Sequence, residues 1–265
     1  MKLQTVALRS IQALISCCLL FETAPAFSQT GPGGVSSGST NLLLWLDGQN
    51  VNADGTNPAI GTEVLTWYDR SGNGVNVTRN ISNVATYSAN GVTFNNTGFL
   101  NGSDATFPTG NASRTVIVCA SSPSTPTDDV FFFYGTANNN QSYGVLKIGT
   151  SNAVRNYFYA NDLDVAGGWT PSGTLKIITL TYASPTQIVY INNNNPPSTK
   201  NAGSVNTTLG AQGLQIGGWN SFTLYSQATI AEIILYDKVL NMAERIIVNN
   251  YLAAKYEIAL AANDL

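Results

Sequence analysis

The sequence predicts an all-β protein, in which two antiparallel sheets form a sandwich that is followed by a short C-terminal helix. Short apolar segments recur between residues 42 and 236, separated roughly every eight to fifteen residues by turns rich in Gly, Asn, Asp, Ser and Pro. The last of them, 230–236, runs into a segment with helical spacing. No repeat or boundary interrupts residues 41–258, which indicates one domain.

The N-terminus has the pattern of a secretory signal peptide. Lys2 and Arg9 flank an apolar run over 11–21, and small residues follow it. This run is too short to span a bilayer. The pattern predicts a signal peptide over 1–28 and therefore a protein that is secreted to the extracellular space or the cell surface.

An alternative for the same segment is lipoprotein processing, because the residues before Cys17 resemble a bacterial lipoprotein cleavage box. Lipid attachment at Cys17 would anchor the chain to a membrane. After the signal peptide we expect a flexible linker over 29–40, the domain over 41–258 and a tail over 259–265.

Composition narrows the classes of partner. The formal net charge is −3 at pH 7, which gives no electrostatic reason to bind nucleic acid or an anionic membrane. The mature chain contains no apolar stretch long enough for a transmembrane segment. Cys119 is the cysteine that remains after the signal peptide, so an intramolecular disulfide is excluded and the domain must rely on its core.

The first elements of the domain are two apolar strands, 42–47 and 64–69. We expect Trp45 and Trp67 in the core. Asp69 begins a Ser-Gly-Asn-Gly turn, and we interpret it as a turn-forming residue before a ligand. The middle of the domain contains further predicted strands over 91–95, 115–120, 130–134, 144–149, 154–160, 175–182, 187–192 and 214–218.

The closing strand and the helix are the most strongly patterned elements. Alternation over 230–236 predicts a central strand with Ile230, Glu232, Ile234 and Tyr236 on one face.

Asn241 lies three residues before Glu244, which is the spacing of a helix-capping box. We expect an apolar stripe of Ala243, Ile247, Tyr251 and Ala254 to pack on the sandwich, with Arg245 and Asn249 facing water.

These motifs resemble the laminin-G-like, concanavalin-type jelly-roll domains of secreted bacterial proteins. The opening "LWLD" and Trp-x-Asp-x-Ser-Gly-Asn-Gly segments match, and so does the closing strand through Ile230, Ala231, Glu232, Tyr236, Asp237, Leu240, Asn241 and Glu244. The resemblance covers about 42–258. It implies a jelly-roll sandwich, and it implies a role in binding more weakly than it implies the fold.

Absent residue types exclude several kinds of catalysis. The chain contains no His, so Ser-His-Asp and Cys-His catalysis and imidazole metal sites are excluded. Glycosidases of this fold resemble one another in a strand of alternating acids, and no such strand occurs here. After the signal peptide the Glu residues are Glu63, Glu232, Glu244 and Glu257. We therefore expect a protein that is not an enzyme.

Aromatic residues at strand ends give the candidate binding site. Trp219 follows two glycines and precedes Asn220, while Phe222 and Tyr225 belong to the same loop. Aromatic faces flanked by amides suit sugar rings. Trp169 and the carboxylate of Glu232 complete the candidate set, and packing at the ends of the core is the alternative role for both tryptophans. For Glu232 the alternative is a structural acid bonded to backbone or Arg.

Calcium is the one metal that the sequence leaves open. Loop oxygens at Asp128, Asp129, Asp162 and Asp164 are weak candidates for Ca²⁺, although neither pair has the spacing of a calcium loop. Solvated turns are the alternative.

Together these features favour a secreted, non-catalytic module that binds glycans or cell-surface polysaccharide. The alternative is a structural or adhesive surface module that binds protein, and a third possibility is a glycoside hydrolase with an unrecognised carboxylate pair.

Overall fold

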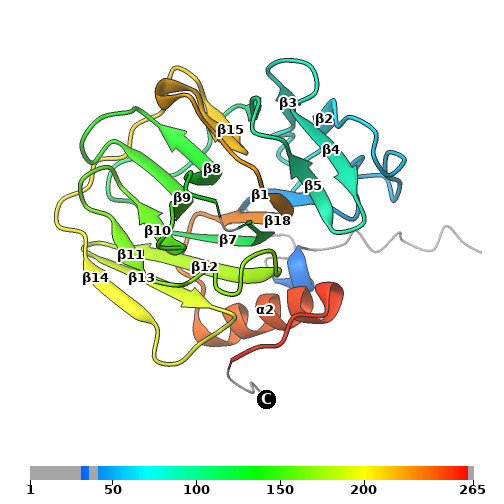
Figure 1. Ribbon diagram of the computed structural model, residues 1–265. Coiled ribbons are helices and arrows are strands. Elements are labelled where there is room, and N and C mark those ends of the chain that lie inside the picture. Colours follow the sequence, from blue (N-terminus) through cyan, green and yellow to red (C-terminus); the bar gives the residue numbers. More distant parts are fainter. Residues whose placement is uncertain (1–30, 36–40, 124, 262–265) are drawn as a thin grey trace, which may run out of the picture.

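The computed structural model describes residues 31–35, 41–123 and 125–261. Two antiparallel sheets pack face to face and one C-terminal helix lies beneath them (Figure 1), which confirms the predicted all-β sandwich. The predicted signal peptide and Cys17 lie outside the described residues. Within them, no helix is long and apolar enough to cross a membrane.

The first sheet has eight strands, with the closing strand β18 at its centre. Its order is β14-β13-β12-β7-β18-β5-β4, and β1 also pairs with β18. The bounds are β1 Leu42–Asp47, β4 Ala85–Ser88, β5 Gly91–Phe94, β7 Arg114–Ser121, β12 Lys176–Ala183, β13 Thr186–Ile191, β14 Ser198–Asn201 and β18 Thr229–Tyr236.

The second sheet also has eight strands, in the order β11-β10-β9-β8-β15-β6-β3-β2. Its bounds are β2 Thr66–Trp67, β3 Val77–Arg79, β6 Leu100–Gly102, β8 Asp129–Gly135, β9 Ser142–Ile148, β10 Ala153–Tyr157, β11 Leu163–Val165 and β15 Leu214–Ile216. A separate hairpin consists of β16 Gly218–Trp219, the 3₁₀ turn η2 Asn220–Phe222, and β17 Leu224–Tyr225.

The main core lies between the sheets. Val118 and Leu180 of the first sheet meet Phe132 and Val145 of the second, and all four are buried. Trp67 belongs to this core. Trp45 is equally buried but lies on the outer face of the first sheet, under the helix. Both tryptophans are therefore core residues, as predicted.

The alternation predicted for β18 holds only beyond a bulge. Pairing with β7 shifts register between Ile230 and Glu232, so Ile230 faces the inner core while Ala231 joins the outer cluster. A β-bulge places two residues opposite one and rotates the side chains before it. The prediction that Ile230 shares a face with Ile234 is therefore wrong.

Helix α2 (Met242–Tyr256) begins with the predicted capping box. Asn241 accepts a hydrogen bond from the Glu244 amide at 3.0 Å, and the Glu244 carboxylate accepts one from the Asn241 amide at 3.0 Å. Both side chains thereby pair backbone donors that the first helical turn leaves unsatisfied.

The helix packs through a different face from the predicted one. Val248, Leu252 and Tyr256 are buried against the first sheet, whereas Ile247 is 46% exposed. Arg245 and Asn249, which the sequence places in water, are buried as well. The guanidinium of Arg245 lies 4.0 Å from the Tyr190 ring centroid, and Asn249 accepts a hydrogen bond from Thr179.

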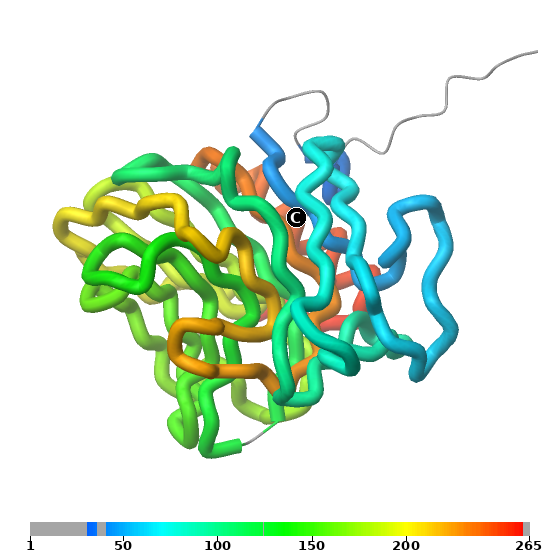
Figure 2. Tube along the Cα trace, turned by 90° about the horizontal axis from the view of Figure 1, so that it is seen from above, coloured from blue at the N-terminus to red at the C-terminus, as the bar shows by residue number. Residues whose placement is uncertain are grey.

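The outer faces of the two sheets are covered differently. Helix α2 covers the first sheet, and the 3₁₀ turn η1 (Pro32–Gly34) packs against the helix. The small β16–β17 hairpin lies over the second sheet. In Figure 2, seen from above, the orange hairpin segment lies beside the green strands and the sheets hide most of the red helix.

Candidate functional site

The β16–β17 hairpin places Trp219 flat on the second sheet. The indole stacks on Phe133 of β8 with ring centroids 4.3 Å apart and is only 3% exposed. The two glycines before Trp219 predict little local cover for this ring. The structure differs because Gly217, with φ 78, turns the chain back onto the sheet.

Three further rings surround Trp219 and together with it form what we term the aromatic surface: Tyr157, Tyr159, Trp219 and Phe222. The Phe222 ring lies 4.2 Å from Trp219 and Tyr157 lies 5.3 Å from it. Tyr159 contacts both Trp219 and Phe222, at 6.3 and 6.1 Å. Phe222 is 47% exposed, so it is the ring that covers Trp219 from solvent.

Trp219 has an unsatisfied donor. Its indole Nε1 is buried and has no hydrogen-bond partner among the described residues. Burying a donor without a partner costs about 1–3 kcal/mol. Other buried polar atoms of the described residues, including Trp169 Nε1 in the core, also lack a partner. The donor of Trp219 therefore points to a ligand only together with the rings around it.

Backbone strain occurs beside the same rings. Tyr159 has φ 50 and Thr223, directly after η2, has φ 52. A bulky or β-branched residue in the left-handed region is a true outlier, and such residues concentrate at ligand sites.

A charged group borders the aromatic surface on β10 and β11. Arg155 donates two hydrogen bonds to Asp164, both at 2.6 Å, and its guanidinium lies 3.8 Å from Asp162. Burial raises the pKa of Asp162 above its ordinary value. Burial, followed by the charge of Asp162, raises the pKa of Tyr157. Asp162 therefore lies close enough to Tyr157 to interact with it.

Only part of the predicted site is brought together. Trp219, Asn220 and Phe222 lie in the hairpin, with Asn220 exposed. Tyr225 lies on β17 and stacks on Phe99, 6.4 Å away, instead of joining the aromatic surface.

Trp169 and Glu232 lie elsewhere. Trp169 is in the inner core, stacked on Phe131 at 4.5 Å. Glu232 is fully buried on the other sheet, where it accepts hydrogen bonds from Trp45 Nε1 at 2.7 Å and Lys255 Nζ at 2.7 Å. The partners of Glu232 are thus side chains of β1 and α2, and not the backbone or Arg partner that the sequence alternative named.

The calcium candidates have protein partners. Asp128 accepts a hydrogen bond from the Gly149 amide at 2.7 Å, and buried Asp129 lies 3.6 Å from Lys147. Asp162 and Asp164 share Arg155. Within residues 31–35, 41–123 and 125–261 no group of three or more acidic, Cys or His side chains is placed to hold a metal ion.

Sequence reasoning missed Arg155, Tyr157 and Tyr159. A signal was present, because residues 157–159 read Tyr-Phe-Tyr and run straight into Asn-Asp. The sequence predicts a strand over 154–160, whereas β10 ends at Tyr157. Tyr159 and Ala160 follow with positive φ, and Tyr159 is half-buried.

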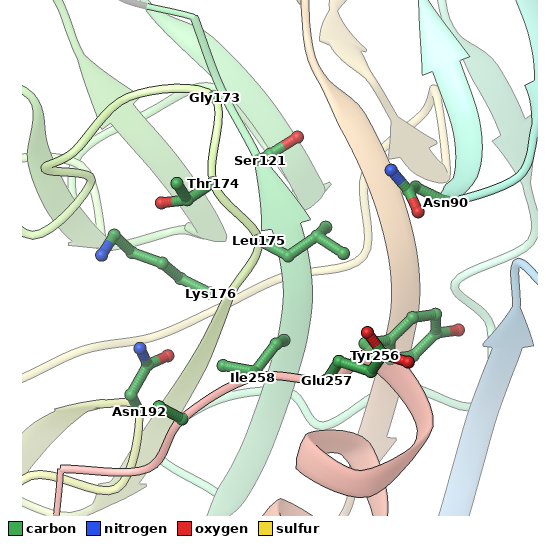
Figure 3. Close-up of a pocket in the computed structure, with 11 residues that line it drawn as sticks. Asn90, Ser121, Gly173, Thr174, Leu175, Lys176, Asn192, Tyr256, Glu257 and Ile258 are labelled. Carbon is green, nitrogen blue, oxygen red and sulfur yellow. The ribbon is translucent and has the colours of Figure 1, made fainter.

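A separate cavity of about 500 Å³ lies at the C-terminal end of α2 (Figure 3). Asn90 and Tyr256 lie on one side and Thr174 and Lys176 on the other. Its only acidic lining residue is Glu257. It therefore offers neither a carboxylate pair nor a cluster of rings, and the aromatic surface is the stronger candidate.

Comparisons with known proteins define the class of fold. No family model and no curated protein matches the sequence. Among solved structures, the chain is similar to β-sandwich domains of glycoside hydrolases, which agrees with a concanavalin-like sandwich.

Three solved structures illustrate this similarity. Trypanosoma rangeli sialidase superposes with a TM-score of 0.57 at 17% identity, over 82% of this chain and 33% of the sialidase chain. Its complex with sialic acid gives 0.55 at 20% identity, with the same coverage. Domain 4 of AbnA, a GH43 extracellular arabinanase from Geobacillus stearothermophilus, gives 0.51 at 16% identity in a complex with arabinotriose, over 79% of this chain and 97% of that domain. The chain thus spans about a third of the sialidase chains.

These matches correct two expectations from the sequence. The expectations of a non-catalytic module and of a protein that is not an enzyme are contradicted, because the solved structures that share the fold include sialidases and a domain of an arabinanase. At identities of 16–20% the similarity establishes the fold and assigns no reaction.

Proposed function

We propose that this chain recognises a glycan and takes part in glycoside hydrolysis, with the aromatic surface as its binding platform. The observation that carries the proposal is the unpartnered Nε1 of Trp219 beneath half-exposed Phe222. A sugar ring offers an apolar face that stacks on half-exposed Phe222, and its hydroxyl oxygens would accept from Trp219 Nε1 once Phe222 moves aside. Exposed Asn220 adds an amide at the rim.

The comparisons support this choice of ligand class. Sialic acid and arabinotriose are the ligands of two of the similar structures, and the arabinanase is extracellular. The proposal has three further parts. The chain is secreted through the predicted signal peptide, it is related to laminin-G-like domains, and its role is to bind carbohydrate.

A second candidate function is hydrolysis by this chain itself, through Asp162 and Asp164. Both carboxylates contact the Arg155 guanidinium, at 3.8 and 2.6 Å. Burial raises the pKa of Asp162, which is the property that a general acid needs, and Asp164 is the second carboxylate of the pair. Adjacent rings supply the binding surface.

Binding is tested by calorimetric titration of the purified secreted chain with arabinotriose and with sialic acid. Losing the half-exposed Phe222 ring removes about 1–2 kcal/mol of contact, so Phe222→Ala should weaken binding by roughly five- to thirtyfold. The matched control is Tyr68→Ala, an aromatic residue that is 42% exposed beside β2, at the other edge of the sheet. Equal affinity in both variants would contradict the proposed surface.

The role of the indole nitrogen has its own variant. Trp219→Phe keeps an aromatic stack on Phe133 and removes the unpartnered N–H. The smaller ring fills less of the buried site, so a modest fall in melting temperature is expected even though the free protein loses no hydrogen bond. We expect glycan binding to weaken as well, and an unchanged affinity would show that the N–H takes no part in binding.

Hydrolysis is tested with fluorogenic arabinosides and sialosides. Asp162→Asn should abolish released fluorophore if the carboxylate pair is catalytic, and Asp54→Asn, an exposed loop acid, is the control. If wild type releases fluorophore and Asp162→Asn releases it equally well, the Asp162–Asp164 pair is not catalytic. The binding proposal is unaffected by that outcome.

A further inference from the structure

Three ionisable side chains from three elements meet on the outer face of the first sheet. Asp47 ends β1, Glu232 lies opposite it on β18, and Lys255 comes from the last turn of α2. The Lys255 Nζ is 2.6 Å from Asp47 Oδ1 and 2.7 Å from Glu232 Oε2. Asp47 Oδ2 also pairs with Arg70.

This triad is enclosed by aromatic rings. Trp45 Nε1 donates to Glu232 Oε1 at 2.7 Å, the Tyr256 hydroxyl lies 3.0 Å from Glu232 Oε2, and Tyr251 lies 3.0 Å from Lys255 Nζ. The side chains of Lys255, Asp47 and Glu232 are 14%, 3% and 0% exposed. Water is therefore largely excluded.

Lys255 Nζ donates a hydrogen bond to Asp47 Oδ1 at 2.6 Å, so the nitrogen lies directly beside this carboxyl group. The same nitrogen lies within hydrogen-bond distance of Glu232 Oε2. Burial raises the pKa of Glu232, so this carboxyl group holds a proton more readily than an exposed one.

We propose that Lys255 and Asp47 condense to an intramolecular amide, with Glu232 as the proton carrier. The Lys255 Nζ attacks Asp47 Cγ, and a new Nζ–Cγ bond forms as the Cγ–Oδ1 bond breaks. Glu232 takes a proton from Nζ and returns one to Oδ1, which leaves as water. One amide and one water replace one amine and one carboxylic acid, and no oxidant is needed.

Arg70 explains why Asp47 reacts and Glu232 does not. Its guanidinium contacts Asp47 Oδ2, the oxygen that gains negative charge as nitrogen attacks, and becomes a donor to the amide carbonyl afterwards. The Glu232 oxygens instead accept from the Trp45 indole and the Tyr256 hydroxyl. These neutral donors stabilise an oxyanion less than a guanidinium does.

The amide would tie the first strand to the last helix, between residues 208 positions apart in the sequence. A cross-link that closes so long a loop restricts the unfolded chain strongly. Lys255→Met should therefore lower the melting temperature strongly relative to wild type. The fall should be larger than that caused by Lys238→Met, which removes the half-exposed Lys238–Glu244 pair.

Peptide mapping of the denatured wild-type protein tests the proposal directly. Condensation removes about 18 Da and blocks tryptic cleavage after Lys255, so peptide 246–265 should appear joined to the peptide that ends at Arg70. Separate peptides of unmodified mass from the folded wild type would overturn the proposal.

Variants separate the amide from other dehydrations. Asp47→Asn should give the same cross-link with a loss of about 17 Da, since ammonia replaces water as leaving group. Glu232→Gln should leave the chains unlinked. If Lys255→Met still shows a mass loss of about 18 Da, the dehydration occurs at another site, and the proposed Lys255–Asp47 amide is wrong. If a variant does not fold, the wild-type map still decides.

Discussion

Asp69 holds together the loop that follows β2. Its carboxylate accepts from the amides of Trp45 at 2.9 Å, Ser71 at 2.9 Å and Val75 at 3.0 Å. The amides of Trp45 and Val75 are in buried segments. One side chain therefore ties the first strand to the turn, which is the turn-forming role that its sequence context predicts.

Asp69→Ala leaves these donors without an acceptor and should lower the free energy of unfolding by about 2–4 kcal/mol. Chemical denaturation measures the loss. Asp54→Ala removes a comparable acceptor from an exposed loop, where water replaces it, and should leave the unfolding midpoint nearly unchanged. Similar midpoints for both variants would contradict the role of Asp69.

Glu232 should give stability a characteristic pH dependence. Burial raises its folded-state pKa above the ordinary value of 4.5, against the opposing effect of Lys255. Below pH 4.5 the carboxyl group is protonated in both states and its contribution is complete. As pH rises from there through the folded pKa, the unfolded chain loses a proton that the folded chain keeps, so stability falls.

Urea titrations at stepped pH should therefore show a downward slope with rising pH in wild type relative to Glu232→Gln, which cannot titrate. Parallel pH profiles for the two proteins would contradict this assignment.

At the scale of single residues the sequence predicts burial better than partners. Trp45, Trp67 and Cys119 are buried as their apolar strands indicate. Asn249 is buried as well, because Thr179 and Asn193 pair its amide, and those partners are distant in sequence. Trp219 packs on the second sheet because the β16–β17 hairpin folds over that sheet, which the local sequence does not indicate.

The helix shows the same limit at the scale of elements. The capping box fixes where α2 begins, since both of its bonds are local. The face that packs depends on the tilt of the helix on the first sheet, and a one-residue rotation exchanges Ile247 for Val248. Local pattern does not specify that rotation.

Two substitutions in α2 distinguish the packed face from the predicted stripe. Leu252 is fully buried, so Leu252→Ala should cost about 2–5 kcal/mol. Ile247→Ala should cost far less, because the side chain is half-exposed and Ala is the better helix former. Thermal melts measure both, and a larger loss from Ile247→Ala would contradict the packing described.

Cys119 reports opening of the whole molecule. Its thiol is fully buried under α2, and burial raises its pKa well above the ordinary value, so the native protein should resist thiol reagents. Leu252→Ala should speed labelling of the Cys119 peptide by roughly tenfold or more, while Ile247→Ala should not. Fast labelling of wild type would show that the helix detaches readily.

The sandwich was predictable because strand spacing and turn residues are repeated throughout the chain, so errors in single strands do not change the class. Short pairings such as β3 with β6 carry little pattern and were missed. The aromatic surface was only half predictable. It joins residues 157–159 to the hairpin at 218–225 across β8, and no local pattern encodes that meeting.

The packing of η1 on α2 has a consequence for orientation. Gly33 lies against Ile247 and Tyr251, so the two ends of the described chain are together on the helix side of the sandwich. The aromatic surface is on the outer face of the opposite sheet. A wall, a membrane or another domain attached through either end would therefore lie on the helix side. The aromatic surface would then face away from that attachment.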